Sequence, residues 1–352
     1  MSACLDTGKL PEAPRSEAEL EELLATPTPA LVALMQRRDG DLLILGAGGK
    51  MGGSLCTLAS RAIALAGAKT RVIAVSRFTD DRVRARLEDA GIETLSHDLL
   101  DPEAIRSLPM APNVIYMVGR KFGTTGEEAQ TWASNVIVPT YVAYHYRAAR
   151  IVAFSTGCVY PLVSAATGGC SETCAPDPVG EYAQSCLGRE RVFEYHSRES
   201  GTRVCQMRLN YAVDLRYGVL HDIGSRIMAG LPVDLTVSHF NAIWQGDANE
   251  RALRCLELCS SPPTAINVTG QETVATRDAA LALGQLLERD VTFTGDEADG
   301  RMYLSDAALS VRHFGAPVVP LATLLQWQAS WLKAGLPSLG RPTHFEVSDG
   351  RF

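Results

Sequence analysis

Short apolar runs alternate with longer amphipathic segments through the first two thirds of the chain. Apolar runs of this length indicate strands that are buried on both faces, and the segments between them have helical spacing. Strand and helix in strict alternation imply right-handed crossovers and a parallel sheet. The pattern therefore predicts an α/β fold, a doubly wound parallel sheet with helices on both faces. The predicted strands are Leu42–Leu45, Arg71–Val75, Ile92–Leu95, Asn113–Val118, Ile151–Phe154 and Val204–Leu209.

The pattern changes on both sides of this region. Before it, Ser16 and Glu19 form a capping box that predicts a helix at Ser16–Leu24, and a second helix is expected at Pro29–Arg38. After about Tyr211, prolines divide the chain into shorter pieces, which indicates a smaller domain. We therefore expect an N-terminal helical arm at 1–40 that packs against the main domain, the main α/β domain at 41–210 with later contributions near 240–268, a smaller domain at 211–340, and a tail at 341–352.

Composition narrows the class of protein. A chain of 352 residues, 46% of them hydrophobic, can bury a large core, and its net charge of −7 argues against a nucleic-acid partner. The N-terminus lacks an apolar signal core and no stretch is long enough for a membrane helix. We expect a soluble, cytoplasmic protein without a membrane partner. The nine cysteines follow no disulfide or zinc pattern, which predicts reduced thiols and no metal site.

A glycine-rich turn follows the first predicted strand, in the sequence DLLILGAGGKMGG. A strand that enters a helix through bare glycines brings backbone N–H groups and a helix N-terminus against a diphosphate. The spacing departs from the GxGxxG fingerprint, because methionine stands where that pattern has glycine, and an ordinary strand-to-helix turn is the alternative. We expect a dinucleotide to contact this turn at Gly46, Gly49, Lys50, Met51 and Gly52.

The ends of the next two strands bear on which dinucleotide binds. Ser76 and Arg77 follow the second strand, where an NAD site usually offers a carboxylate to the ribose 2′-hydroxyl. A hydroxyl followed by a guanidinium suits a 2′-phosphate, so NADP(H) is favoured; NAD(H) is acceptable if Arg77 only lies in solvent. Asp98, after the third strand, is expected to accept a hydrogen bond from the adenine amino group or to cap the helix that begins near Pro102.

Several motifs in the expected order carry a family resemblance. They are the glycine turn, Asp98, Asn135, STGCVYP at Ser155–Pro161, Tyr182 in GEYAQSC, and Arg208-Leu209-Asn210. With these the chain resembles the extended short-chain dehydrogenase/reductases, the NAD-dependent epimerase/dehydratase family, over roughly residues 41–337. The resemblance implies a Rossmann-like nucleotide-binding domain, a smaller C-terminal substrate domain, chemistry on sugar derivatives, and a homodimer formed by the helices that contain Asn135–Tyr146 and Tyr182–Ser197.

The resemblance also implies the catalytic residues. It assigns the hydroxyl that bonds a substrate oxygen to Thr156 and the acid/base tyrosine to Tyr182. The family motif is YxxxK, but Cys186 stands in the lysine position of this chain. A lysine one helical turn after the tyrosine lowers the tyrosine's pKa and contacts the nicotinamide ribose, and a thiol does neither reliably. Tyr182 as a core aromatic is the alternative.

Three interpretations of Cys186 stay open at this point. In the first, another cation takes over, with Lys121 or Arg120 after the fourth strand as the nearest candidates. In the second, the enzyme catalyses a reaction that depends less on the deprotonated form of Tyr182. In the third, catalysis is lost and the chain is a nucleotide-binding sensor or partner protein. Cys186 as a covalent nucleophile is less expected, because small buried cysteines usually serve packing.

The sequence says less about the residues that would bind the substrate. Asn210, Arg216 and His221 lie where the family draws its sugar-binding residues, and they suit ring hydroxyls, a carboxylate or a phosphate. A solvated loop is the alternative. We predict an NAD(P)-dependent oxidoreductase or epimerase that transfers hydride at a carbinol carbon of a sugar, nucleotide sugar or sugar-acid derivative. The alternative is a catalytically silent NAD(P)-binding protein.

Overall fold

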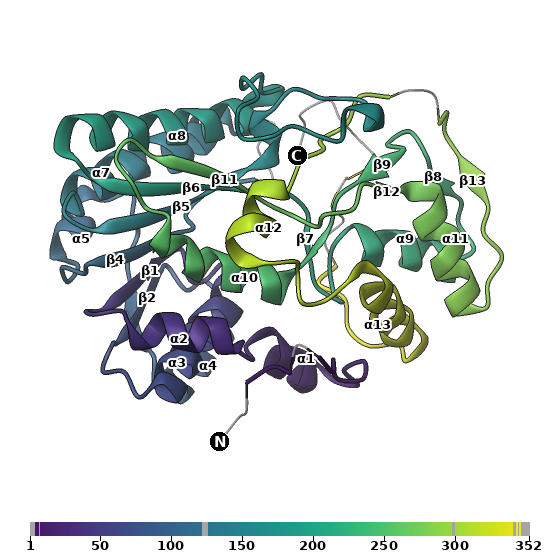
Figure 1. Ribbon diagram of the computed structural model, residues 1–352, viewed down its shortest axis with the longest axis horizontal. Coiled ribbons are helices and arrows are strands. Elements are labelled where there is room, and N and C mark those ends of the chain that lie inside the picture. The colour runs from purple at the N-terminus through teal and green to yellow at the C-terminus, as the bar shows by residue number, and fades with distance from the viewer. Residues whose placement is uncertain are drawn as a thin grey trace.

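A seven-stranded parallel sheet forms the centre of the computed structural model (Figure 1), which describes residues 4–6, 8–121, 126–297, 300–340, 343 and 345. The strand order is β11-β6-β5-β4-β1-β2-β3, and each neighbouring pair is parallel. The strands are β1 Leu42–Leu45, β2 Val72–Ser76, β3 Glu93–Ser96, β4 Asn113–Tyr116, β5 Arg150–Thr156, β6 Arg203–Leu209 and β11 Thr264–Val268.

Helices cover both faces of this sheet because alternate strand residues point to opposite sides. Leu42 and Ile44 of β1 belong to one apolar cluster, and Leu43 and Leu45 belong to another. The first cluster is closed by α2 (Pro29–Gln36), α3 (Gly52–Ala66), α4 (Asp81–Asp89) and α10 (Gln245–Arg254). The second is closed by α5 (Pro102–Ser107), α7 (Val138–His145) and α8 (Gly180–Ser200).

The predicted fold class is confirmed: the architecture is a Rossmann-like doubly wound α/β sheet. The six strands expected from the apolar runs are β1 to β6, each with ends within two residues of the prediction. The seventh strand, β11, extends the sheet beside β6 and comes from the region near 240–268 that was expected to contribute late. The prediction did not resolve it as a strand.

A second core, made mainly from the chain after Tyr211, lies beside the sheet. It contains α9 (Val219–Met228), α11 (Thr276–Leu287) and α13 (Leu321–Lys333), seen on the right of Figure 1. The strand pairs around it are β7 (Ala212–Val213) with β10 (Ile243–Trp244), β8 (Val233–Asp234) with β13 (Phe293–Thr294), and β9 (His239–Phe240) with β12 (Val274–Ala275). Further helices are α6 (Glu128–Trp132), a π-helical turn at Ala133–Ile137, and α12 (Ala308–Phe314). The domain boundaries at 210 and 340 stay predictions.

The N-terminal arm contacts both cores. Its first helix, α1 (Glu17–Leu24), is capped by Ser16, whose hydroxyl accepts the Glu19 N–H as the capping box predicts. Leu20 and Leu24 are buried in the second core, whereas α2 packs on the sheet. The arm therefore joins the two cores, rather than packing on the main domain alone. Within the described residues we find no helix long and apolar enough to cross a membrane.

Candidate active site

The glycine turn after β1 has two glycines that packing requires and one that faces open space. Gly46 has a φ of +91°, and a Cβ there would lie 2.9 Å from the backbone carbon of Met117 at the end of β4. A Cβ on Gly52 would lie 2.3 Å from the carbonyl oxygen of Ala47. A Cβ on Gly49 would meet only the Gly46 carbonyl oxygen, at 3.4 Å. A side chain at Gly49 would therefore project into the space that the turn encloses.

That space is a cavity of about 720 Å³ along the carboxyl ends of the strands. Its lining comes from the segments that follow β1, β2, β3 and β4, which is where doubly wound sheets bind ligands. The first turn of α3 opens toward Gly49 without a side-chain cap on its N–H groups, because its N-cap residue is Met51. Bare amides at a helix N-terminus beside an uncrowded glycine fit a diphosphate.

Ser76 and Arg77 line this cavity at the end of β2, and Arg77 is exposed at its rim. Asp98 lines it after β3, and its Oδ1 accepts the Leu100 N–H at 3.0 Å. The alternative that Asp98 caps the next helix is wrong, because Asp101 is the N-cap residue of α5.

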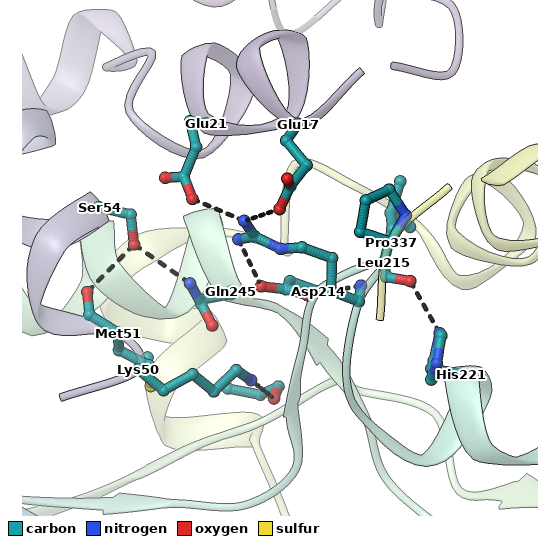
Figure 2. A network of polar contacts seen from close by, with 12 residues as sticks. Glu17, Glu21, Lys50, Met51, Ser54, Asp214, Leu215, His221, Gln245 and Pro337 are labelled. Carbon is teal, nitrogen blue, oxygen red and sulfur yellow. Dashed lines mark hydrogen bonds and ion pairs between the residues drawn. The ribbon is translucent and has the colours of Figure 1, made fainter. Parts of the chain in front are cut away.

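The side chains of Met51 and Lys50, which were expected to contact the dinucleotide, contact other parts of the protein. The side chain of Met51 packs against the apolar cluster under α3. The side chain of Lys50 extends away from the turn (Figure 2). Its ammonium reaches the segment after β6, where it donates to the Ala212 carbonyl at 3.3 Å and lies 4.0 Å from the centre of the Tyr217 ring. Crowding by surrounding protein lowers the pKa of Lys50 to about 8, although solvent reaches the side chain.

Thr156 and Tyr182 come together at the carboxyl end of β5. Thr156 ends the strand, and its hydroxyl accepts the Cys158 N–H at 3.1 Å. Tyr182 lies in the first turn of α8, and the Thr156 side chain lies near enough to the Tyr182 hydroxyl to oppose part of the rise in its pKa. Two hydroxyls that meet at this edge can bond the same substrate oxygen. The structure thus brings together the pair that the resemblance implied, on the same sheet edge as the glycine turn.

Cys186 lies one helical turn after Tyr182 and is 1% exposed. Burial raises the pKa of Cys186 to about 11, and the nearby Tyr182 hydroxyl opposes part of that rise. Burial raises the pKa of Tyr182 well above its usual value, and the nearby thiols of Cys186 and Cys158 add to this. The phenol of Tyr182 therefore keeps its proton at neutral pH.

Two cations lie near this pair, and the sequence prediction named one of them. Lys121 interacts electrostatically with Cys158 and Cys186, which places it on the thiol side of the site. The other is Arg189, a buried guanidinium on α8 that opposes the rise in the pKa of Tyr182. Arg189 follows Tyr182 by seven positions on the same helix, so both lie on one face of it. Helical periodicity in the sequence could therefore have identified Arg189 as a candidate cation.

Arg189 is held firmly. Its Nη1 donates to the Phe154 carbonyl at 2.7 Å, and its Nη2 donates to Asn135 Oδ1 at 2.7 Å. Arg120, the other cation considered from the sequence, has its guanidinium 3.9 Å from the Glu127 carboxylate and lines the dinucleotide-sized cavity instead.

Comparison with known proteins shows which family the sheet domain matches. Residues 42–213 match the model of the NAD dependent epimerase/dehydratase family. This part of the chain is a domain of that family. Epimerases and dehydratases are enzymes, and Cys186 stands in this chain where the motif YxxxK that the resemblance implied has its lysine. No curated protein matches the chain in sequence. The arm formed by α1 and α2 lies outside the matched residues.

Solved structures share the fold of this chain over most of its length. A variant of UDP-glucuronic acid 4-epimerase from Bacillus cereus, solved with UDP-4-deoxy-4-fluoro-glucuronic acid and NAD, is 15% identical with a TM-score of 0.69, over 83% of this chain and 99% of that one. UDP-glucose 4-epimerase from Thermotoga maritima, with UDP-glucose, is 17% identical with a TM-score of 0.68, over 84% and 99%. The enzyme from Thermus thermophilus, with NAD, is 17% identical with a TM-score of 0.66, over 82% and 97%.

The residues predicted to bind substrate have hydrogen-bond or ion-pair partners within the protein. Asn210 is buried, and its amide donates to the Tyr303 carbonyl at 3.1 Å. Arg216 is buried between Asp214 and two carboxylates of α1, at 3.0 Å from Asp214 Oδ2 (Figure 2). The ring nitrogens of His221 lie 2.9 Å from the Leu215 carbonyl and 2.9 Å from Ser338 Oγ. These contacts do not favour a substrate role for Arg216 or His221.

Proposed function

We propose that this protein is an NAD(P)-dependent oxidoreductase or epimerase that transfers hydride at a carbinol carbon of a sugar, nucleotide sugar or sugar-acid derivative. The observation that carries the proposal is that the side chains of Thr156 and Tyr182 lie near each other on the sheet edge that also holds the glycine turn. The related folds include epimerases solved with NAD and UDP-sugars, which supports this substrate class.

The chemistry divides between the nucleotide and the chain. The bound nicotinamide supplies the acceptor or donor of hydride. Thr156 bonds the substrate oxygen and fixes its position, and Tyr182 exchanges a proton with that oxygen as the carbon gains or loses hydride. Since Tyr182 is protonated at rest, the transfer it is prepared to make is donation to the oxygen of a carbonyl that is being reduced.

NADP(H) is the cofactor that the end of β2 supports best, with NAD(H) as the alternative. The cavity is lined there by Ser76 and Arg77, a hydroxyl and a guanidinium, and by no carboxylate of that segment. The epimerases of similar fold were solved with NAD, so the choice needs a measurement. Titration calorimetry of Arg77→Ala should show NADP(H) binding weakened by about 1–3 kcal/mol and NAD(H) binding little changed. Equal losses would overturn the assignment.

A catalytically silent NAD(P)-binding protein is the second candidate function. Two observations favour it: Cys186 replaces the lysine, and the pKa of Tyr182 is raised rather than lowered. The test of the first proposal is turnover with both nucleotides and a panel of sugars, sugar acids and UDP-sugars, measured beside Tyr182→Phe. We expect turnover that falls about 10²-fold or more in Tyr182→Phe. Nucleotide binding with no turnover by the natural chain would favour the silent protein.

We also propose a homodimer formed through the α7 and α8 region. These two helices lie side by side in Figure 1, and with the preceding turns they expose large apolar side chains. These are Trp132, Ile137, Tyr144 and Tyr195, at 37%, 45%, 66% and 61% exposed. A group of large apolar side chains on one surface is typical of an interface. Sedimentation should show a dimer for the natural chain and a monomer for Tyr144→Glu with Tyr195→Glu; a natural monomer would contradict it.

A further inference from the structure

Arg189 is a buried positive charge on α8, and no carboxylate of the described residues forms an ion pair with it. The residue is 6% exposed. Its two Nη atoms donate to uncharged acceptors, the Phe154 carbonyl and Asn135 Oδ1, each at 2.7 Å. Its buried Nε has no hydrogen-bond partner in this part of the chain. A charge without a counter-charge is costly to bury, so its position calls for a functional explanation.

The adjacent carboxylate, that of Glu190, is held by other groups. It accepts Nε and Nη2 of Arg208 at 2.9 and 2.7 Å, and the Ser155 hydroxyl at 2.5 Å. Glu190 and Arg208 therefore neutralise each other, and the charge of Arg189 is left over. Three further groups act on Arg189 but are protonated at neutral pH, because burial raises the pKa of each: Cys186, Tyr116 and Tyr182.

Arg189 reaches back along α8 toward the lysine position of the motif YxxxK. Side chains on a helix lean toward its N-terminus. Asn135, which accepts Nη2 of Arg189, donates to the Ser185 hydroxyl at 2.9 Å, and that hydroxyl donates to the Tyr182 carbonyl at 2.8 Å. Two hydrogen bonds thus connect the guanidinium to Ser185, the residue before the lysine position.

The guanidinium also lies against the wall of the cavity at the glycine turn. Gly119 lines that cavity after β4, and a Cβ on Gly119 would lie 2.5 Å from Nη2 of Arg189. The Phe154 carbonyl that accepts Nη1 is two residues before Thr156 on β5. The charge is therefore fixed between the cavity wall, the strand that carries Thr156 and the helix that carries Tyr182.

On the basis of the proposed function, we infer that Arg189 takes over the electrostatic role of the missing lysine, as a positioning residue that stabilises the negative charge left on Tyr182 when it gives up its proton. In that step the O–H bond of Tyr182 breaks and its proton joins the oxygen of the substrate carbonyl, whose carbon accepts hydride from the reduced nucleotide. The electron pair stays on the tyrosine oxygen, and a fixed cation in a buried site lowers the cost of that charge.

The first measurement needs no substrate. A fluorinated tyrosine placed at position 182 ionises at lower pH than tyrosine, so absorbance and fluorine NMR can follow its phenol. We expect the pKa of this phenol to rise by about one pH unit or more in Arg189→Met, and by less in Arg189→Lys, which keeps the charge. An unchanged pKa in Arg189→Met overturns the inference.

The second measurement is turnover of the full chain on the panel of sugars, sugar acids and UDP-sugars. Arg189→Met should lower kcat about 10²-fold while KM and the Kd of the nucleotide change little, and Arg189→Lys should recover part of the loss. Cys186→Lys in the Arg189→Met background should also recover turnover, because it returns a cation to the tyrosine's helix. If Arg189→Met does not fold, Arg189→Gln, which keeps a donor without the charge, gives the same comparison.

Arg251→Met is the matched control. Arg251 is a buried guanidinium that also donates to uncharged acceptors, the Ser310 hydroxyl at 2.6 Å and the Gly315 carbonyl at 2.8 Å, and it lines a separate cavity beside α2. Its loss should lower the urea midpoint without changing kcat or the pKa of the phenol at position 182.

Two results of the turnover measurement would overturn the inference. One is an Arg189→Met variant that loses stability but keeps kcat, and the other is a loss of kcat in Lys121→Met without one in Arg189→Met. If the natural chain turns over no member of the panel, the proposed function fails, and the titration of the phenol still decides whether Arg189 stabilises a charge on Tyr182.

Discussion

Replacing Cys186 with lysine restores the family motif, yet we expect it to damage this protein. The thiol is 1% exposed, so a longer side chain overpacks its surroundings at a cost of about 1–3 kcal/mol. The new ammonium also repels Arg189, whose charge already acts on Cys186. At a separation of roughly 8 Å and an effective dielectric constant of about 20, that repulsion is about 2 kcal/mol. The free energy of unfolding should therefore fall by about 3–5 kcal/mol.

Urea unfolding of the natural chain, Cys186→Lys and Cys186→Ala measures this loss, and the alanine variant corrects for the missing thiol. A double-mutant cycle with Arg189→Met isolates the charge repulsion from the overpacking. We expect Cys186→Lys to be less damaging in the Arg189→Met background by about 2 kcal/mol, because the guanidinium is gone. Turnover should fall along with stability in Cys186→Lys alone.

The opposite result would refute this reasoning. If Cys186→Lys unfolds at the same urea concentration as Cys186→Ala and raises turnover from an inert natural chain, the lysine was simply lost and nothing replaced it. The silent nucleotide-binding protein would then be the better account of the natural sequence.

Two further outcomes are expected. Gly49→Val should abolish nucleotide binding in calorimetry while leaving the unfolding transition nearly unchanged, because the new side chain meets open space rather than protein; retained binding would exclude a diphosphate at the turn. Glu17→Gln with Glu21→Gln should lower the free energy of unfolding by about 1 kcal/mol, since both carboxylates are partly exposed and Arg216 keeps Asp214; no change in urea midpoint would show that α1 holds by its apolar side chains alone.

The sheet was predictable because its signals are local. The four residues of β1 are all buried, and a parallel strand covered on both faces must be apolar at each position, which a reader of the sequence sees directly. The helix that carries Tyr182 was equally visible. Arg189 was not predicted, because the cations considered as replacements for the lysine were those in the loop after β4 and not those on α8.

The ion-pair partners of Arg216 on α1 could not be predicted from the sequence. A buried guanidinium near a polar, aromatic-rich segment indicates an anion site, and the segment after β6 has that composition. Glu17 and Glu21 satisfy Arg216 from a helix nearly two hundred residues earlier in the chain. No spacing rule connects such positions, because their contact depends on how the arm crosses from the sheet to the second core.

The loss of the motif lysine changes how charge is arranged around the tyrosine in the proposed enzyme. In the family pattern, one ammonium lies on the tyrosine's own helix and lowers its pKa. Here Arg189 is committed to Asn135 and Phe154, and its opposing effect is smaller than that of burial, so Tyr182 stays protonated. The proton that Tyr182 holds is therefore available for the oxygen of a carbonyl that is being reduced, and the buried guanidinium of Arg189 is the cation on the tyrosine's own helix.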